Sequence, residues 1–424
     1  MTNLRNSILK RLRGSKRKKG GGINNQYIRD ALSLAKFVDC SKTDLEQKQQ
    51  NFERVASNVS DRVCHWYLPP FENPNYGGIM TILRLAAFLK KEYRIQSRIF
   101  ICGKCDAIEV AKKISQAMPV LTGIEVVSLD TVLAIARIPP SDYSVATLWT
   151  TAYVVLKLNN TGLKFYMIQD FEPLFYPAGS TFAQAELTYR FGFFGIANTQ
   201  SLNNIYKERF NGKAVTLNPS VDSKIFYQGT NLPRDEQKKL FYYARPGVPR
   251  NCFELAIAAL RIVKERMGDR VRIICAGQNW NPDEFELEGI VETIGMLPYD
   301  KTGDLYRSCH VGLSMMMTPH PSYLPFEMMG CGTLVVANRN SANTWILKDR
   351  INCLISEPTA SCLSETLIDS LTNYESYADI RQNAADFIRE NHGDWYGSLK
   401  LVADFMINLH LNEEERDCTD ASNS

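Results

Sequence analysis

The fold is decided by the stretch Ser314-Met-Met-Met-Thr-Pro-His-Pro-Ser-Tyr-Leu-Pro-Phe-Glu327-Met-Met-Gly-Cys-Gly-Thr-Leu-Val-Val-Ala337. An apolar run over residues 311–317 predicts a buried strand, and Pro325 is expected to begin a short helix. Residues 333–337 form a second apolar run and predict another strand. The order strand, loop, helix, strand is typical of a doubly wound α/β sheet, in which ligands bind at the carboxyl ends of the strands.

The loop inside this stretch offers a site for an anionic group, because it places backbone N–H groups at the start of a helix. Glu327 lies one turn into that helix. An ionised carboxylate accepts hydrogen bonds and donates none, so its expected partners are hydroxyl groups of a ribose or a sugar. The alternative is a surface glutamate on an ordinary helix.

Two arginines upstream flank another helix entrance. Residues 239–245 predict a strand, the loop that follows is rich in turn residues, and a helix is expected from Asn251 or Cys252 onward. Arg245 and Arg250 can converge on one diphosphate, because a guanidinium group binds phosphate oxygens two at a time and keeps its charge. The alternative is a pair of solvated arginines in a surface loop.

Taken together, these motifs resemble the nucleotide-sugar half of the GT-B glycosyltransferases of family 4. Arg245 and Arg250 fall on the two basic positions of that family, and Glu327 falls on the second glutamate of its Glu-x7-Glu segment. The first glutamate, which contacts hydroxyls of the donor sugar in relatives, is replaced here by Pro319. The resemblance covers residues 236–385 and extends more weakly over the amino-terminal half.

The resemblance implies a binding site for a nucleotide sugar. Glu327 would bind the ribose, and the backbone of Gly295, Met296 and Leu297 would meet the edge of the base. It also places one loop against the diphosphate and the sugar, mainly through main-chain amides; the residues are His320, Ser322, Tyr323 and Leu324.

The amino-terminal half carries further candidate positions. Residues 62–68 predict a strand, which is followed by a turn-rich loop ending in Gly77 and Gly78 and then by a helix. In the family such glycines lie beside the donor phosphate and the acceptor, although a turn before a helix needs only one of them. Another predicted strand ends before Asp170 and Glu172, either of which could replace a histidine that many family members have near the reacting sugar. A structural acid at this turn is the alternative.

The fold class that we predict is α/β, with two Rossmann-like doubly wound domains facing a central cleft. A chain of 424 residues with 45% hydrophobic residues is long enough for two domains with substantial cores. We expect a basic arm at residues 1–22, an acceptor-side domain at 23–235, a nucleotide-sugar domain at 236–385, a helix at about 386–412 returning to the first domain, and a disordered tail at 413–424. Further strands are predicted at residues 98–102, 123–128, 144–150, 164–169, 270–277 and 291–297.

The composition narrows the class of protein. Lys and Arg number 49 against 46 Asp and Glu, so nothing general indicates nucleic-acid binding. Eleven cysteines without disulfide-like spacing favour a reducing, cytoplasmic compartment. The apolar runs are shorter than a membrane span.

Charge is concentrated at the start of the chain. Residues 1–22 contain eight Lys or Arg and no acidic residue, together with an apolar stripe. This pattern predicts contact with an anionic membrane surface, worth about 1 kcal/mol for each basic residue near the lipid. A disordered solubilising arm and an RNA-binding arm are the alternatives.

The resemblance implies a retaining glycosyltransferase with Arg245, Arg250 and Asp170 as candidate catalytic residues and with no metal ion or other cofactor. The stretches Gln169-Asp-Phe-Glu-Pro and Pro321-Ser-Tyr-Leu-Pro-Phe-Glu327 resemble those of rhamnosyltransferases of bacterial S-layer glycan assembly. That likeness implies dTDP-β-L-rhamnose as donor, a rhamnan chain on a lipid carrier at the inner face of the cell membrane as acceptor, and a β1,2 linkage. The alternatives are a UDP- or GDP-sugar donor, a nucleotide-sugar epimerase of the same fold, and a catalytically silent sugar-binding subunit.

Overall fold

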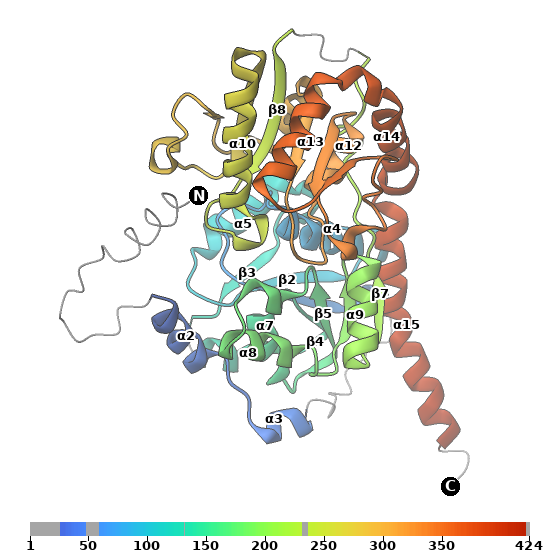
Figure 1. Cartoon of the computed structure of the whole chain (residues 1–424). Coiled ribbons are helices and arrows are strands. Elements are labelled where there is room, and N and C mark those ends of the chain that lie inside the picture. Colours follow the sequence, from blue (N-terminus) through green and yellow to red (C-terminus); the bar gives the residue numbers. More distant parts are fainter. Residues whose placement is uncertain (1–25, 48–58, 131, 231–235, 421–424) are drawn as a thin grey trace, which may run out of the picture. The chain divides into compact units, whose positions relative to one another are not determined.

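The computed structural model describes residues 26–47, 59–130, 132–230 and 236–420 (Figure 1). By their internal contacts the residues divide into two units, 1–39 and 40–424. The described part of the first unit contains helix α2 (Gln26–Phe37). The basic arm predicted at residues 1–22 lies outside the described residues. Both sheets belong to the second unit.

The first half of this unit is built on a seven-stranded parallel sheet with the strand order β3-β2-β1-β4-β5-β6-β7. Every residue of β4 is buried, because a parallel sheet is covered by helices on both faces. The strands are β1 (Val63–Leu68), β2 (Gln96–Ile101), β3 (Glu125–Ser128), β4 (Ser141–Ala146), β5 (Thr161–Ile168), β6 (Phe194–Ala197) and β7 (Ala214–Thr216). The helices are α3 (Lys42–Gln47), α4 (Gly77–Tyr93), α5 (Ala107–Ala117), α6 (Val132–Ala136), α7 (Trp149–Leu156), α8 (Ser180–Thr188) and α9 (Gln200–Phe210).

The second half is built on a six-stranded parallel sheet with the order β10-β9-β8-β11-β12-β13. Its strands are β8 (Lys238–Ala244), β9 (Val271–Gly277), β10 (Glu292–Thr293), β11 (Val311–Ser314), β12 (Leu334–Asn338) and β13 (Leu354–Ser356). Its helices are α10 (Phe253–Met267), α11 (Tyr299–Ser308), α12 (Leu324–Gly330), α13 (Ala360–Thr372) and α14 (Ala378–His392). The α/β class with two doubly wound halves is therefore confirmed.

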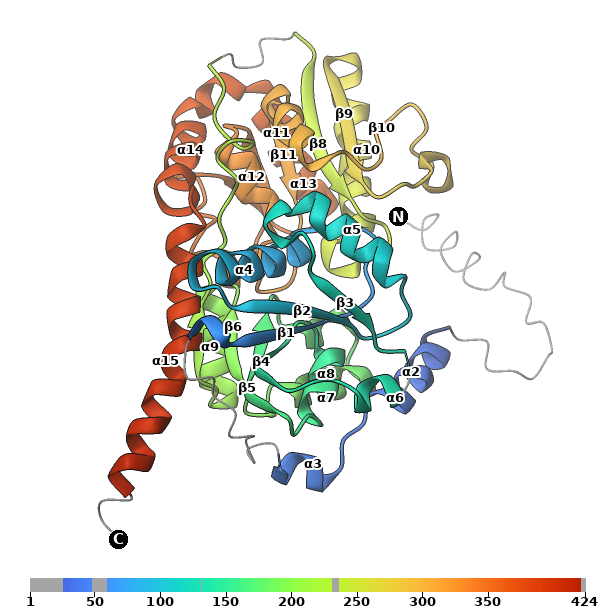
Figure 2. The same cartoon turned by 180° about the vertical axis from the view of Figure 1, so that it is seen from behind.

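In each sheet the chain adds strands first toward one edge and then toward the other, while all strands stay parallel. This change of direction falls between β1 and β4 in the first sheet and between β8 and β11 in the second (Figure 2). In doubly wound folds such a reversal opens a crevice at the carboxyl ends of the strands, and ligands bind there. The loops that follow β1, β4, β8 and β11 are consequently the segments placed to form a site.

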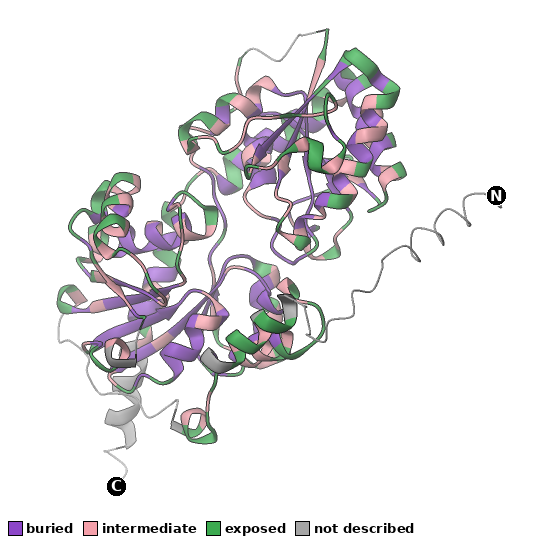
Figure 3. Cartoon of the chain, turned by 90° about the vertical axis from the view of Figure 1, so that its left-hand side faces the viewer, coloured by how far each residue is buried: buried purple, intermediate pink, exposed green. Residues whose placement is uncertain are grey.

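Buried residues concentrate on the strands of both sheets and on the helix faces that cover them (Figure 3). The last two helices divide between the halves. Helix α14 contributes Ala384 and Ile388 to a core of the second half. Helix α15 (Tyr396–Asp420) contributes Leu399, Val402 and Met406 to the core of the first half. The chain thus returns to the first half in the region where we predicted a returning helix.

Several element boundaries differ from the prediction. Helix α15 continues to Asp420, whereas a disordered tail was expected from residue 413; the Glu and Arg residues at 413–416 are strong helix formers despite their polarity. The strand expected over 144–150 ends at Ala146, because helix α7 begins at Trp149. The strand expected over 291–297 is reduced to two residues of β10, and Gly295 then turns the chain with φ 64°.

Candidate functional site

A cavity of about 410 Å³ opens where the loops of the two switch points meet, a volume within the usual range for ligand pockets. The site residues predicted from the sequence line it, with one exception. They are Gly77, Gly78, Asp170, Arg245, Arg250, Met296, Leu297, His320, Ser322, Tyr323, Leu324 and Glu327.

Gly295 is the exception, and the prediction that its backbone meets a base is not supported. Its carbonyl oxygen accepts a hydrogen bond from the backbone N–H of Gly277 at 3.0 Å. A side chain at this position would collide with Asn279, since an added Cβ would lie 2.5 Å from Oδ1. Gly295 is therefore a turn residue, and Met296 and Leu297 form this part of the wall.

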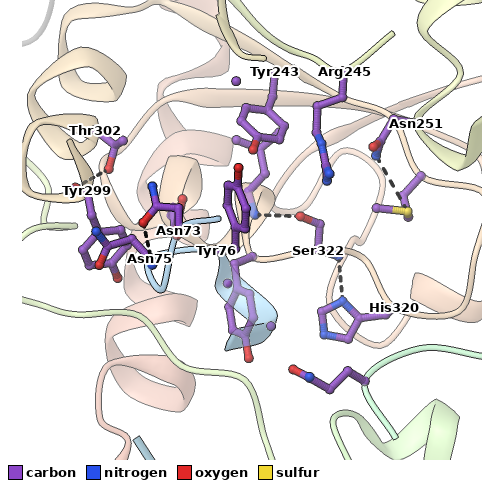
Figure 4. Close-up of a pocket in the computed structure, with 18 of the residues that line it drawn as sticks. Asn73, Asn75, Tyr76, Tyr243, Arg245, Asn251, Tyr299, Thr302, His320 and Ser322 are labelled. Atoms are coloured by element: carbon purple, nitrogen blue, oxygen red, sulfur yellow. Dashed lines mark hydrogen bonds between the residues drawn. The ribbon is translucent and has the colours of Figure 1, made fainter. Parts of the chain in front are cut away.

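The two arginines differ in how far the protein engages them. Arg250 lies with its guanidinium 4.2 Å from the ring centre of Phe175, and its Nε lies 4.0 Å from Oδ2 of Asp170. Arg245 directly follows β8 and projects into the cavity (Figure 4). Within the described residues, no hydrogen bond or ion pair holds the Arg245 guanidinium. Contacts within the protein thus orient Arg250, whereas the Arg245 guanidinium is available to a ligand.

Asp170 links the first half to the loop after β11. Its Oδ2 accepts a hydrogen bond of 2.7 Å from the Thr318 hydroxyl, and its Oδ1 accepts one of 2.8 Å from the backbone N–H of Phe171. Burial raises the pKa of Asp170 to about 6, while Thr318, Arg250 and backbone N–H groups act in the opposite direction. The carboxyl group therefore holds Arg250 and this loop in place.

Two asparagines that the sequence analysis missed support the loop after β11. Asn338 at the end of β12 receives the backbone N–H of Met316 on Oδ1 at 2.7 Å and donates from Nδ2 to the Met316 carbonyl at 3.0 Å. Asn340 donates to the carbonyl oxygens of Met316 at 3.1 Å and Thr318 at 2.9 Å. These bonds replace the ladder of a sheet, which explains why β11 ends at Ser314 instead of residue 317.

Two amides near the end of this loop contact acceptors inside the loop. The backbone N–H of Ser322 donates to His320 Nδ1 at 2.9 Å, and that of Leu324 lies 3.4 Å from Ser322 Oγ. The Ser322 amide already has an acceptor, so this structure does not support the expectation that it faces a diphosphate. The Leu324 amide makes only a long contact, and its part of the expectation stays a prediction. Ser322 adopts φ 69°, which the local hydrogen bonds hold in place.

The side chain of Tyr323 packs between the two halves. Its hydroxyl lies 2.6 Å from Thr81 Oγ1 on α4 and receives a hydrogen bond of 3.0 Å from Asn198 Nδ2 after β6. Its ring occupies the space beside Gly77, where an added Cβ would lie 2.8 Å from the ring. Gly77 is needed for this packing between the halves, and not only for the approach of a ligand.

Helix α4 begins at the cavity wall. Its first residues, Gly77 and Gly78, line the cavity, and the residue before them, Tyr76, gives the helix no side-chain cap. The first backbone N–H groups of a helix lack intrahelical acceptors, and the helix dipole favours an anion near them. The start of α4 is thus a second source of positive potential, opposite the arginines of the second half.

Glu327 lies on α12 at the cavity wall. Its Oε2 accepts a hydrogen bond from the Tyr306 hydroxyl at 3.4 Å, a long contact for an O–H donor. Burial raises the pKa of Glu327 to about 8, with Tyr306 and Arg84 acting in the opposite direction. The carboxyl group therefore has acceptor capacity left for a ligand.

The cavity has two chemically different ends, with Tyr76 and Tyr243 between them (Figure 4). Arg245, Asn251, His320 and Ser322 lie toward one end, and Tyr299 and Thr302 lie toward the other. The sequence analysis did not single out several lining residues: Asn73, Asn75, Tyr76, Gln169, Phe175, Asn198, Tyr243, Asn251, Tyr299 and Thr302. Most are neutral polar or aromatic residues in loops, and their types alone carry no signal of a site.

Glu172 belongs to the framework of the first half. Its Oε2 accepts hydrogen bonds from the backbone N–H of Trp149 at 2.6 Å and from the Tyr166 hydroxyl at 2.8 Å. Burial raises its pKa to about 8. Glu172 is 2% exposed, and although it belongs to the cavity wall, its hydrogen bonds hold the start of α7.

The described residues contain no group of three His, Cys, Asp or Glu side chains placed to hold a metal ion. Among the helices described here, none combines the length and the apolar character needed to cross a membrane.

Comparison with protein families gives two matches. The family model described as "WsaF, N-terminal domain" matches residues 71–201, and "WsaF, C-terminal domain" matches residues 238–368; together they cover more than half of the chain. The O-antigen biosynthesis protein RfbC of Myxococcus xanthus is 37% identical over 345 residues, which make up 81% of this chain and 27% of RfbC. The chain thus spans about a quarter of the length of this curated relative.

Solved structures show the same architecture. HepE of Anabaena, crystallised with UDP, matches with a TM-score of 0.62 and 15% identity, over 82% of this chain and 100% of HepE. The sucrose-phosphate synthase of Thermosynechococcus elongatus matches with a TM-score of 0.59 and 13% identity, over 85% of this chain and 100% of that chain. These likenesses establish the fold. The chain belongs to the WsaF family, and its fold is that of the GT-B glycosyltransferases.

Proposed function

We propose that this chain is a retaining glycosyltransferase that moves a sugar from a nucleoside diphosphate to a growing saccharide. One observation carries the proposal: a single cavity joins the arginine pair, Arg245 and Arg250, to an under-coordinated carboxyl group, Glu327. A nucleoside diphosphate has the matching chemistry, with two anionic phosphates at one end and ribose hydroxyls that can donate to a carboxylate.

The diphosphate is assigned to Arg245, Arg250 and the start of α4. Arg250 is already oriented by Phe175 and Asp170, so binding does not have to order it. Arg245 gains its first charged partner on binding. The start of α4, at Gly77 and Gly78, adds backbone donors from the other half.

The same groups support catalysis. When the bond between the sugar and the diphosphate breaks, negative charge develops on the departing phosphate, and fixed positive charges next to it lower the barrier. Two guanidinium groups and a helix start supply that charge, so we propose a reaction without a metal ion. Asp170 contributes by orienting Arg250.

The donor that we propose is dTDP-β-L-rhamnose, joined through a β1,2 linkage to a rhamnan chain of a cell-surface S-layer glycan. The WsaF match supports polysaccharide assembly, and so does the name of the Myxococcus xanthus relative, an O-antigen biosynthesis protein. A 6-deoxy sugar suits the apolar Met316 and Leu324 in the cavity wall. A UDP- or GDP-sugar is the alternative; HepE was crystallised with UDP and glucose.

The acceptor is proposed to be a saccharide on a lipid carrier, approached at the cytoplasmic face of the cell membrane. The basic residues of the segment 1–22 support this placement by their charge. In the first half, Phe175 lines the cavity and its neighbour Leu174 is 44% exposed. Apolar surface of this kind packs against the CH groups of a sugar ring.

The proposal is tested by incubating the protein with nucleotide sugars and saccharide acceptors, with EDTA present. We expect transfer of rhamnose from dTDP-β-L-rhamnose, with retained configuration, and no loss of turnover in EDTA. Epimerised donor without transfer would favour the epimerase alternative. Loss of turnover in EDTA would contradict the metal-independent reaction.

A further inference from the structure

Three buried polar atoms at the cavity lack protein partners. They are His320 Nε2, Asn251 Oδ1 and Gln169 Oε1, and within the described residues none of them has a hydrogen-bond partner. All three residues line the cavity. A buried donor or acceptor without a partner costs roughly 1–3 kcal/mol, so such atoms are expected where a ligand supplies the missing bond.

The proton on His320 is fixed by its own loop. Nδ1 accepts the backbone N–H of Ser322 at 2.9 Å and therefore carries no proton. Burial and the nearby Arg250 lower the pKa of His320 to about 3, so the ring is neutral and the proton lies on Nε2. His320 is only 7% exposed and presents one N–H donor without charge.

Asn251 is oriented in a similar way. Its Nδ2 lies 3.3 Å from the carbonyl oxygen of Met315 and donates to it, which leaves Oδ1 as a free acceptor. Asn251 is 8% exposed, and no other protein group offers Oδ1 a donor within the described part of the chain. Gln169 lies beside the start of α4, with its amide 3.4 Å from the point where a Cβ of Gly78 would lie.

The contacts of Asp170 bring these three residues to one place. Gln169 precedes Asp170 in the chain. Asn251 follows Arg250, whose Nε lies 4.0 Å from the Asp170 carboxylate. His320 lies two residues after Thr318, which donates to the same carboxylate at 2.7 Å. The free atoms consequently come from three segments that meet beside the arginine pair, where the proposed function places the end of the diphosphate that carries the sugar.

We propose that His320, Asn251 and Gln169 form a neutral subsite for the hydroxyl groups of the transferred sugar. This inference rests on the proposed function. A sugar hydroxyl both donates and accepts, so it can accept from His320 Nε2–H and donate to an amide oxygen of Asn251 or Gln169. The subsite takes the place of the glutamate that Pro319 replaces, and it adds no negative charge next to the departing diphosphate.

The test separates the sugar from the nucleotide by titrating the protein with two matched pairs of ligands, dTDP-β-L-rhamnose with dTDP and UDP-glucose with UDP. In His320→Asn the amide oxygen can still accept the Ser322 N–H, but the donor at Nε2 is lost. We expect His320→Asn to weaken binding of the nucleotide sugar by about five- to tenfold and to leave binding of the nucleoside diphosphate unchanged. His320→Gln, which can place an N–H near the Nε2 position, is expected to restore part of the affinity.

A matched control is available in the same half. His310 is also buried and also accepts a backbone N–H on Nδ1, from Lys239 at 3.0 Å, but it does not line the described cavity. His310→Asn is expected to leave both affinities unchanged, while Asn251→Ala is expected to weaken binding of the nucleotide sugar selectively.

Three results would overturn the inference. If His320→Asn weakened binding of the nucleoside diphosphate and of the nucleotide sugar equally, His320 Nε2 would contact the diphosphate and not the sugar. Unchanged affinity for both would leave the side chain without a ligand contact. Failure of the wild-type protein to bind either pair of ligands would contradict the proposed function together with the subsite. This result is seen in the wild-type protein alone, so it is distinct from the two results that concern the variants.

Discussion

Glu172 in the first half and Glu327 in the second are both buried glutamates whose pKa is raised to about 8, and both line the same cavity. Their hydrogen bonds differ. One oxygen of Glu172 accepts two bonds, of 2.6 and 2.8 Å, from Trp149 and Tyr166. Glu327 accepts one contact of 3.4 Å from Tyr306. A raised pKa therefore does not distinguish the two carboxyl groups, whereas their hydrogen bonding does, and it favours Glu327 as the proposed ligand contact.

The same contrast separates the two arginines and the loop amides. Arg250 is braced by Phe175 and Asp170, while Arg245 has no such partners among the described residues. The amide of Ser322 has an acceptor at 2.9 Å, while those at the start of α4 have no side-chain cap. We infer that the ligand binds to the groups whose hydrogen bonds or ion pairs the protein itself does not complete.

The largest effect is expected from Glu172→Ala. Removing the carboxyl group leaves the Trp149 N–H and the Tyr166 hydroxyl buried without an acceptor, which should cost roughly 2–4 kcal/mol of unfolding free energy. Chemical denaturation measures this loss. An unchanged unfolding free energy combined with lost nucleotide affinity would break the comparison, because Glu172 would then be the ligand-binding glutamate.

Arg245→Ala should act on binding and not on stability. The lost charged hydrogen bonds are expected to cost roughly 1.5–3 kcal/mol of binding free energy for a nucleoside diphosphate, with little change in the unfolding free energy. Isothermal titration calorimetry measures the first and denaturation the second. Arg389→Ala on α14, where the arginine side chain is 66% exposed, is the matched control and should change neither. Unchanged nucleotide affinity in Arg245→Ala would refute the assignment of the diphosphate.

Glu327 should make nucleotide binding depend on pH. Its folded pKa of about 8 means that the free protein holds the group protonated below pH 8, while ribose hydroxyls bind best to the carboxylate. Binding therefore releases a proton, and affinity is expected to rise between pH 6 and pH 8, by up to about fiftyfold for a fully ionised bound carboxyl group, and to level off above about pH 9. In Glu327→Gln the rise should disappear; a variant that keeps the full pH dependence would assign it to another group.

The smallest effect is expected from Tyr323→Phe. The hydroxyl bonds to Thr81 and Asn198 tie the second half to the first, and their loss should lower the unfolding free energy by about 1 kcal/mol. Gly77→Ala tests the same packing with a larger change, because the added Cβ would collide with the Tyr323 ring. Should Tyr323→Phe leave stability intact yet weaken nucleotide binding, the hydroxyl would belong to the ligand site.

Much of the second half could be predicted from the sequence, because its signals are local. The apolar runs on either side of Glu327 are short and bounded by turn residues, and they form β11 and β12 as neighbouring parallel strands. The helix start near Pro325 and the one after Arg250 were placed within a residue or two, since proline and turn residues mark such boundaries.

What could not be predicted depends on contacts between distant segments. The sequence around Ser322 does not reveal that the Ser322 amide donates to the His320 ring. It also does not reveal that the Asn338 side chain accepts the Met316 N–H, which a neighbouring strand would otherwise accept. Gly77 has the local signature of a ligand-binding turn, yet the space that its missing side chain would occupy is taken by the ring of Tyr323 from the other half. Gln169 and Asn251 are ordinary polar residues in sequence, and only their burial without partners marks them as candidates.

A crystal structure of the protein with dTDP, grown in the presence of EDTA, tests the central claim most directly. We expect the diphosphate to lie within hydrogen-bonding distance of Arg245 and Arg250, and the ribose hydroxyls to donate to Glu327. A nucleotide bound outside this cavity, or one that binds only when a divalent metal ion is supplied, would contradict it.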